Sequence, residues 1–364
     1  MTEYGKAGID YEVLDESKRA AIDFARATSP LLAQHGGAAV EASRGASAFV
    51  FELGGQHLAF VVEGLGTKSI VARQWWEATG EDRFGDVAID TVGAIVNDVC
   101  SVGALPVVVN AYFATGRSDW HTAGHGIGSL LAGWQRGCEL AGATWGGGES
   151  PALPGLVNPD EIELAGSSVG AVPAGWAPVL GDDLRPGDRI VLVESAGLHA
   201  NGATLARSAT DRLPDGLTTP MPSGRRFGDA LLDPSLIYVP LVAELHRRGV
   251  RPTYLSHVTG HGLRKLMRAT AELTYVVEAL PDVPEVLAFL VDQAAMSPRE
   301  AYGTFNMGAG YAVYVRPEDA EGVVAAAAAC GLRAAVSGHV EAGARRLEVP
   351  PIDAAWTSEE LDLA

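Results

Sequence analysis

Apolar and polar residues alternate along the first half of the chain in two periods, one typical of strands and one typical of helices. Short apolar runs rich in β-branched residues predict four strands, at residues 47–53, 57–62, 106–114 and 163–172. Apolar and small residues at helical spacing predict two helices, at 84–103 and at about 120–141. Gly54 and Gly55 join the first two strands into a hairpin, because glycine accepts the backbone angles of a tight turn.

Two stretches of the first half show neither period. Residues 1–45 are polar and begin with a loop-like segment, and residues 144–155 contain too much glycine and proline for regular structure. The second half repeats the mixed pattern after a segment at 173–188 that is rich in proline, glycine and aspartate. Residues 189–195 then predict a strand, and residues 311–340 predict a β-α-β unit around an alanine-rich helix.

The length of 364 residues favours two domains, because a single core stops growing well below that size. We place the domain boundary in the segment at 173–188, whose composition is typical of a linker. The expected fold is therefore mixed α/β, with an N-terminal domain at 1–172, a C-terminal domain at 173–345 and an acidic, loosely held tail at 346–364.

The net charge and the cysteine content of the chain exclude several classes of partner and scaffold. The chain has 27 Lys+Arg against 45 Asp+Glu, a net charge of −18 that repels nucleic acids and anionic membranes but leaves room for a phosphorylated small molecule. Its three cysteines form no CxxC pair, which favours a reduced compartment over a disulfide or zinc scaffold. No apolar signal core and no run of the roughly 18 apolar residues of a membrane helix is present. We expect a cytoplasmic protein.

A glycine-rich turn, EGLGTK at residues 63–68, follows the second predicted strand. Closely spaced glycines let backbone N–H groups turn toward an anion and a lysine adds positive charge, so the turn is a candidate phosphate site. It is not a P-loop, since Thr67 separates the glycine from the lysine. By itself the segment fits a tight turn with a surface lysine equally well.

Two acidic positions are candidate ligands of a metal ion or of nucleotide phosphates. Asn97 and Asp98 lie late in an otherwise apolar helix, where a buried carboxylate needs a cation or hydrogen-bond donors. Glu149 follows three glycines at 146–148 that permit close backbone approach to a ligand. The alternatives are a solvated last helical turn for the first pair and an exposed acid on a flexible loop for Glu149.

Two further motifs come from the second half of the chain. SAGLHANG at 195–202 follows a predicted strand, and such strand-to-helix turns often bind anions. Its His199 is a candidate for titration near neutral pH, although a lone histidine in such a turn is more often a packing or hydrogen-bonding residue. TFNMGAG at 304–310 precedes a strand, and its chemistry alone indicates no role.

In combination and in order, these segments resemble the aminoimidazole ribonucleotide synthetase (phosphoribosylformylglycinamidine cyclo-ligase) superfamily. The most specific segments are GLGTK (64–68), VNDV (96–99), GLHANG (197–202) and TFNMG (304–308). The others are YGKAGID (4–10), GALP (103–106), YFATG (112–116), GGE (147–149), LPG (153–155), LAG (164–166), IYV (237–239) and HVTGHG (257–262). The resemblance covers about residues 1–340, nearly the whole chain.

The resemblance implies an N-terminal α/β domain that contributes strands to a dimeric β-barrel, a C-terminal α/β domain beside it, and ATP in a groove between the two. We therefore expect a homodimer. It also implies a cyclo-ligase that uses ATP and Mg²⁺ to phosphorylate the formyl-amide oxygen of formylglycinamidine ribonucleotide, after which the neighbouring amine closes an imidazole ring. By position, the expected catalytic residues are Lys68, His199 and Asn201. The expected nucleotide contacts are Gly64, Gly66, Thr67, Lys68, Asn97, Asp98, Gly148 and Glu149, and the expected Mg²⁺ ligands are Glu63, Asp98 and Glu149.

The chain departs from the family pattern at several of these segments. Glu63 and Glu163 stand where the family has aspartate, and each is one methylene longer. Ala152 replaces an acid, Leu236 replaces an arginine and His261 replaces the middle glycine of a GGG turn. These changes preserve the ATP-handling half better than the substrate half and suggest a paralogue.

Three functions are consistent with these observations. The first is the purine cyclo-ligase itself. The second is a paralogue that applies the same phosphorylation to another substrate, as in the wider superfamily of selenophosphate synthetase, thiamine-phosphate kinase and the hydrogenase maturation dehydratase. The third is a non-catalytic nucleotide-binding partner. Retention of Lys68, Asp98 and Glu149 argues against the third, and the absence of a cysteine before Cys100 argues against selenophosphate chemistry.

Overall fold

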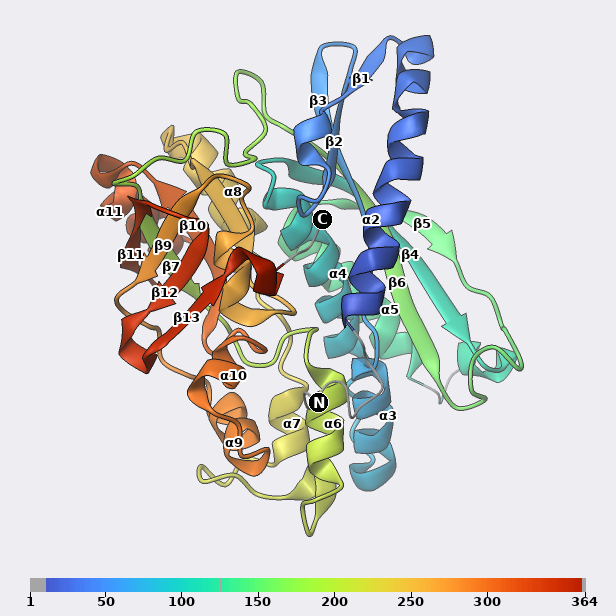
Figure 1. Ribbon diagram of the computed structural model, residues 1–364. Helices are drawn as coiled ribbons and strands as arrows, with labels where there is room; N and C mark the ends of the chain where they lie inside the picture. Colours follow the sequence, from blue (N-terminus) through green and yellow to red (C-terminus); the bar gives the residue numbers. More distant parts are fainter. Residues whose placement is uncertain (1–10, 123, 125, 362–364) are drawn as a thin grey trace.

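The computed structural model describes residues 11–122, 124 and 126–361, which form two mixed α/β units, each built around one sheet (Figure 1). The first sheet has six strands and the second has seven. The mixed α/β fold class expected from the sequence is therefore confirmed. The family's opening segment at residues 4–10 lies outside the described residues.

The N-terminal sheet has the strand order β1-β2-β3-β6-β4-β5. Its strands are β1 (Gly37–Ala39), β2 (Phe49–Leu53), β3 (Gln56–Gly64), β4 (Leu105–Thr115), β5 (Thr144–Glu149) and β6 (Ile162–Ala171). The predicted hairpin is confirmed, since β2 and β3 pair across Gly54 and Gly55, both of which have positive φ. Strands β4 and β5 run parallel, whereas the other neighbours are antiparallel.

Helices cover one face of this sheet. The helices of this half are α2 (Tyr11–Thr28), α3 (Lys68–Thr79), α4 (Phe84–Cys100) and α5 (Ile127–Ala141). A side chain at Gly166 of β6 would approach Ile95 of α4 to 2.8 Å and Trp134 of α5 to 3.0 Å. Glycine at this position therefore lets both helices pack directly on the strand. Ile95 and Trp134 are fully buried there.

The opposite face of the N-terminal sheet keeps large apolar side chains in solvent. Phe60 is 40% exposed, Val62 is 64% exposed and Tyr112 is 37% exposed. The three share one face, because β3 pairs with β6 and β6 with β4, and alternate residues of a strand point the same way. The sheet is thus covered on one side and only partly covered on the other.

The C-terminal sheet has the strand order β13-β12-β9-β11-β7-β10-β8. Its strands are β7 (Arg189–Glu194), β8 (Tyr254–His257), β9 (Leu273–Val277), β10 (Ala309–Val315), β11 (Ala334–Ala342), β12 (Arg346–Val349) and β13 (Ala354–Thr357). The helices of this half are α6 (Ala203–Thr210), α7 (Phe227–Leu231), α8 (Val239–Arg248), α9 (Glu285–Gln293), α10 (Pro298–Tyr302) and α11 (Ala320–Ala329). The alanine-rich helix α11 connects β10 to β11, as the sequence predicted.

The expectation of a loosely held tail at 346–364 is wrong for its described part. Strands β12 and β13 extend the C-terminal sheet, and residues 358–361 form a short 3₁₀ turn, η8 (Ser358–Leu361). Leu347 and Val349 are fully buried and Trp356 is 2% exposed. The segment is acidic overall, but its apolar and polar residues alternate, and this alternation is typical of a strand.

Three other expectations need correction. The polar N-terminal stretch, for which no helix was predicted, contains helix α2 at residues 11–28. The glycine-rich stretch at 144–155 begins with strand β5, where a side chain at Gly148 would approach the carbonyl oxygen of Ala111 to 2.0 Å. The helix expected at about 120–141 begins only at Ile127, after a short 3₁₀ turn at 118–121, and the helix predicted at 84–103 ends at Cys100.

The segment at 173–188 connects the two sheets without a helix or strand. Val179 of this segment packs at Gly103, where an added side chain would lie 2.7 Å from the valine. Helix α8 of the C-terminal half contacts α4, α5 and β4. Among the described residues, none of the helices is both long and apolar enough to cross a membrane.

Candidate active site

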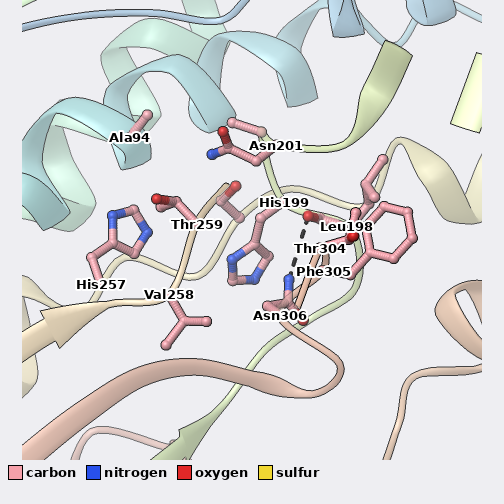
Figure 2. A pocket seen from close by; sticks show the side chains of 12 residues that line it. Ala94, Leu198, His199, Asn201, His257, Val258, Thr259, Thr304, Phe305 and Asn306 are labelled. Atoms are coloured by element: carbon pink, nitrogen blue, oxygen red, sulfur yellow. Dashed lines mark hydrogen bonds between the residues drawn. The ribbon is translucent and has the colours of Figure 1, made fainter. Parts of the chain in front are cut away.

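A pocket lies where helix α4 of the N-terminal unit faces four loops of the C-terminal unit (Figure 2). Helix α4 contributes Ala94, and the remaining walls come from segments that the sequence analysis singled out. Figure 2 shows His199 and Asn201 on one loop and His257 on another, all beside the pocket. The other lining residues are Leu198, Ala200, Ser235, Val258, Thr259, Thr304, Phe305 and Asn306.

His199 is held in an unusual backbone conformation on the loop that follows β7. Its φ is 62°, in the left-handed region that few residues other than glycine and asparagine adopt. Its Nε2 accepts a hydrogen bond from the backbone N–H of Ala196 at 3.1 Å. The proton of the neutral ring therefore sits on Nδ1, which is buried and has no partner among the described residues. Nδ1–H is therefore a buried hydrogen-bond donor of a residue that lines the pocket, without a partner among the described residues.

Of the two interpretations of His199, the structure favours a hydrogen-bonding residue over a group that titrates near neutral pH. Burial lowers the pKa of its imidazole to about 3, and the electrostatic effect of the neighbouring His257 and Lys68 lowers it further. The ring is 4% exposed, so its charged form would lose most of its hydration. At physiological pH His199 is a neutral donor rather than a proton carrier.

Asn306 joins the segment at 304–308 to the loop at 197–202 through hydrogen bonds. Its Oδ1 accepts hydrogen bonds from the hydroxyl of Ser195 at 2.7 Å and from the N–H of Gly308 at 3.0 Å. Its Nδ2 donates to the carbonyl oxygens of Gly197 at 2.8 Å and Leu198 at 3.4 Å (Figure 2). The asparagine therefore fixes the loop that carries His199 and Asn201.

Lys68 does not line the pocket, but its ammonium group hydrogen-bonds the backbone of the pocket residue His199. Its side chain is fully buried, and Nζ forms an ion pair with Asp90 of α4 at 2.6 Å. The same atom donates to the carbonyl oxygens of His199 at 2.9 Å and Asp233 at 3.3 Å. Asp90 in turn accepts a hydrogen bond from the N–H of Ser235 at 2.8 Å. The sequence indicated a phosphate contact for Lys68, whereas the structure places its ammonium group where it holds two C-terminal loops.

Asn97 and Asp98 have different surroundings although they are adjacent. Asn97 is fully buried and binds backbone only, accepting from the N–H of Tyr238 at 2.8 Å and donating to the carbonyl oxygen of Leu236 at 2.9 Å. Asp98 is partly exposed, and its Oδ1 accepts a hydrogen bond from Nδ1–H of His257 at 2.8 Å. Sequence reasoning did not identify His257 or Asp90, and the only signal for His257 was its place in HVTGHG.

Two backbone N–H groups of the glycine turn at 64–66 already form hydrogen bonds within the chain. The N–H of Leu65 donates to the carbonyl oxygen of Leu164 at 2.7 Å, and the N–H of Gly66 donates to the Glu163 carboxylate. Burial raises the pKa of Glu163, and the hydrogen bond from Gly66 opposes that rise. Thr67, at the start of α3, shares a hydroxyl hydrogen bond of 2.7 Å with Thr204 of α6. The amide of Gly66, which was expected to contact the nucleotide, therefore binds strand β6 instead, as does that of Leu65.

The three expected metal ligands do not converge within the chain. Glu63 shares a ladder position with Gly166, so it points to the helix-covered face of the sheet. Glu149 pairs with Tyr112 and points to the opposite face, where it is exposed and accepts a hydrogen bond from the N–H of Ser150 at 3.1 Å. No group of three or more His, Cys, Asp or Glu side chains within the described ranges is arranged to hold a metal ion.

Two family descriptions match most of the chain. AIR synthase related protein, N-terminal domain, matches residues 45–172, and AIR synthase related protein, C-terminal domain, matches residues 185–349. The chain belongs to the AIR synthase-related family. Together the two matches include the glycine turn, the end of α4 and every loop that lines the pocket.

Curated members of this family share about a third of their residues with the chain. The phosphoribosylformylglycinamidine cyclo-ligase of Methanothermobacter thermautotrophicus is 34% identical over 276 residues, 75% of this chain and 78% of the relative. The enzyme of the same name from Myxococcus xanthus is 36% identical over 292 residues, 77% of this chain and 79% of the relative. The one from Thermococcus gammatolerans is 32% identical over 321 residues, 88% of this chain and 90% of the relative. The chain is thus an enzyme of the ATP-dependent ligase class.

Solved structures of more distant proteins have the same fold. The complex of AaThiL with AMPPCP and TMP gives a TM-score of 0.58 at 16% identity and covers 84% of this chain and 87% of that chain. The hydrogenase maturation protein HypE in complex with ATP gives a TM-score of 0.59 at 18% identity and covers 82% and 83%. At such identities the likeness concerns the AIR synthase-like fold alone.

Proposed function

We propose that the chain is a cyclo-ligase that converts formylglycinamidine ribonucleotide to aminoimidazole ribonucleotide, with ATP bound near the pocket between the two domains, taken as 1–172 and 173–345. The observation that carries the proposal is the neutral Nδ1–H donor of His199 in this pocket, next to Asn201. Cyclo-ligases of this name are similar to the chain over about three quarters of its length or more.

The proposed reaction has two steps. The formyl-amide oxygen attacks the γ-phosphorus of ATP, which forms an iminophosphate and releases ADP. The neighbouring amine then attacks the imidate carbon, the C–O bond breaks and inorganic phosphate leaves as the ring closes. Phosphorylation is needed because an amide oxygen is otherwise a poor leaving group.

His199 and Asn201 have complementary roles in this proposal. A neutral imidazole N–H donates to the oxygen that carries the phosphate without taking part in a proton equilibrium, because the pKa of His199 is about 3. The exposed amide of Asn201 lies near Gly260, where an added side chain would come within 3.4 Å of its Oδ1. We propose that Asn201 orients the substrate amide against the loop at 257–262.

ATP binding is supported by the fold. Two proteins of the same fold were solved with a nucleotide, one with AMPPCP and one with ATP. In this chain the N-terminal amides of α3, from Thr67 onward, and the exposed Gly148 are the proposed nucleotide contacts, whereas Lys68 and Asn97 act by positioning loops. Glu149 points to the other face of the sheet, so it is not among the proposed contacts.

The residues present fit Mg²⁺ only as a partner of ATP phosphates. Asp98 is the one of the three expected ligands that lies beside the pocket, where its carboxylate contacts the pocket residue His257. Magnesium is commonly held by one or two carboxylates together with phosphates and water. Such an ion would neutralise charge on the transferring phosphate, and Asp98 is its proposed ligand.

We further propose that the chain acts as a homodimer through the exposed face of the N-terminal sheet. Phe60 and Val62 of β3 and Tyr112 of β4 form an exposed apolar surface. Both strands pair with β6, which lies between them in the sheet. A second copy placed on this face would bury these side chains and cover Glu149, which points to the same side.

A paralogue with another amide or amidine substrate is the second proposal, and two positions favour it. Leu236 stands where the family has arginine, and its side chain packs against the core instead of supplying charge. His261 stands where the family has glycine and adopts a φ of 74°. The test of both proposals is ADP release from ATP with a panel of amides led by formylglycinamidine ribonucleotide. Release with that substrate alone supports the cyclo-ligase, and release with another amide only supports the paralogue.

A further inference from the structure

Arg264 connects three segments that are far apart in the sequence. It lies in the 3₁₀ helix η5 (Gly262–Met267), directly after the pocket loop at 257–262. Its guanidinium donates to the carbonyl oxygen of His261 at 3.3 Å and to that of Gly303 through two nitrogens, at 3.1 and 2.8 Å. A further nitrogen donates to the carbonyl oxygen of Glu360 at 2.8 Å.

Two of these segments line the pocket. His261 ends the loop that carries His257 and Thr259, and Gly303 immediately precedes the lining residues 304–306. The two loops also touch directly, since a side chain at Gly262 would come within 2.7 Å of the carbonyl oxygen of Phe305. A shift of either loop therefore moves the other.

The third segment is the C-terminal end of the described chain, and it is firmly anchored. Arg299 of α10 forms an ion pair with the Glu360 side chain at 2.6 Å and lies over the ring of Trp356. The other Glu360 oxygen accepts a hydrogen bond from the N–H of Thr357 at 3.0 Å. The match to the family's C-terminal domain ends at residue 349, so residues 350–361 lie outside the matched region.

We propose that the C-terminal segment 350–361 acts through Arg264 as a clamp that positions the two pocket loops at 257–262 and 303–308. Arg264 is a positioning residue, because it does not line the pocket and its described hydrogen bonds hold backbone carbonyls of the loops. The planar guanidinium is suited to this task, since its N–H groups point in several fixed directions at once. This inference rests on the proposed function only for the consequence that the pocket loops bind substrate.

Hydrogen–deuterium exchange on the ligand-free full-length protein tests the clamp without reference to any reaction. Arg264→Lys keeps the charge but cannot reach three carbonyls, and Glu360→Ala loosens the segment that supplies one of them. In both variants we expect amide exchange at 257–262 and 303–308 to rise by roughly tenfold, because protection follows local opening. Arg346→Ala, which removes an exposed arginine of β12, is the control and should leave both loops unchanged.

The double variant Arg264→Lys/Glu360→Ala separates a clamp from two independent defects. If both residues act through one connection, exchange in the double variant should equal that of the more affected single variant, since effects of coupled sites do not add. Faster exchange at 350–361 with unchanged exchange in both pocket loops would overturn the proposal. Additive effects would overturn it as well.

Steady-state kinetics gives a second measurement. With formylglycinamidine ribonucleotide and ATP, Arg264→Lys should raise the KM for the ribonucleotide by about tenfold and change kcat by less than about threefold, as for loss of uniform binding. A fall in kcat at constant KM would contradict a positioning role. If the wild type releases no ADP with this substrate, the proposed function fails, whereas the exchange result still decides the clamp.

Discussion

Lys68 and His199 are 131 residues apart in the sequence, yet the ammonium group of the first donates to the backbone carbonyl of the second at 2.9 Å. The lysine belongs to the N-terminal unit and the histidine to the C-terminal unit. The contact therefore fixes the pocket donor His199 relative to helix α4, whose Asp90 forms an ion pair with the same lysine.

Replacement of Lys68 by methionine should destabilise the protein by about 3–5 kcal/mol, because it leaves the Asp90 carboxylate buried without its cation. Urea denaturation at neutral pH measures this change in the free energy of unfolding. Arg247→Met, at an exposed ion pair with Glu244, should change it by less than about 0.5 kcal/mol. A loss below about 1 kcal/mol in Lys68→Met would show that the buried pair is not an anchor.

His199→Asn should keep more activity than His199→Ala. Asparagine places an N–H donor near the position of Nδ1 and tolerates a φ of 62°, whereas alanine supplies no donor. Loss of a hydrogen bond to a charged group is worth about 1.5–3 kcal/mol, so His199→Ala should release ADP more slowly by roughly ten- to a hundredfold. Equal rates for the two variants would exclude a donor role.

The low pKa of His199 also predicts the sign of a pH effect on stability. The folded-state pKa of about 3 lies below the ordinary value of 6.5, so the unfolded chain binds more protons between these two values. The stabilisation is complete above pH 6.5 and is lost as the pH falls toward 3. The free energy of unfolding of His199→Asn should consequently fall less steeply from pH 6.5 to 4.5 than that of the wild type.

Asp98→Asn should weaken Mg²⁺-dependent ATP binding by about tenfold or more, because a charge-assisted contact is lost while Oδ1 still accepts from His257. Calorimetric titration with ATP, in the presence and absence of Mg²⁺, measures the effect. Asp119→Asn, in an exposed pair with Arg117, is the matched control. Wild-type affinity and wild-type ADP release in Asp98→Asn would remove this residue from the site.

Val62→Asp should convert the proposed dimer to a monomer, because it introduces a charge into an apolar face that is 64% exposed at this position in the single chain. Light scattering at micromolar concentration should give about twice the chain mass of 37.9 kDa for the wild type and about that mass for the variant. Arg136→Ala on α5, which covers the other face, should remain dimeric. A monomeric wild type would contradict the proposal directly.

Leu236→Arg and His261→Gly restore the family pattern at two positions. If the chain has diverged from the purine reaction, each reversion should improve turnover of formylglycinamidine ribonucleotide, and an added arginine contact is worth about tenfold in affinity. Steady-state kinetics with this substrate decides the question. Efficient turnover by the wild type, with both reversions harmful, would favour the plain cyclo-ligase.

Much of the fold could be predicted from the sequence because its signals are local. The hairpin at Gly54-Gly55 and the helix that begins at Phe84 follow from residues within a few positions of one another. Strand β13 was missed because its apolar residues alternate within an acidic segment, and β5 was missed because its glycines are required by the neighbouring strand and not by a turn.

The site was harder to predict because its key partners are backbone atoms. Lys68 and Asn97 were identified as candidate site residues, but apart from the Lys68–Asp90 ion pair their side chains bind main-chain groups of residues 199, 233, 236 and 238. Every residue has a backbone carbonyl oxygen, so the residue types of a segment do not show which carbonyl will accept a hydrogen bond. Asp98 and His257 are joined through their side chains, yet 159 positions separate them and neither type is rare enough to indicate the other.

The same backbone contacts affect how the two halves can be recombined among relatives. Lys68, Asp90 and Asn97 of the N-terminal half bind peptide groups of the C-terminal half, and every residue type supplies the same peptide oxygen, while all but proline supply the N–H. A hybrid enzyme joined within residues 173–188 would keep these anchors whichever relative donated its second half. Bonds that join two side chains, such as Asp98–His257 and Thr67–Thr204, are contacts that such a hybrid must inherit from matched parents.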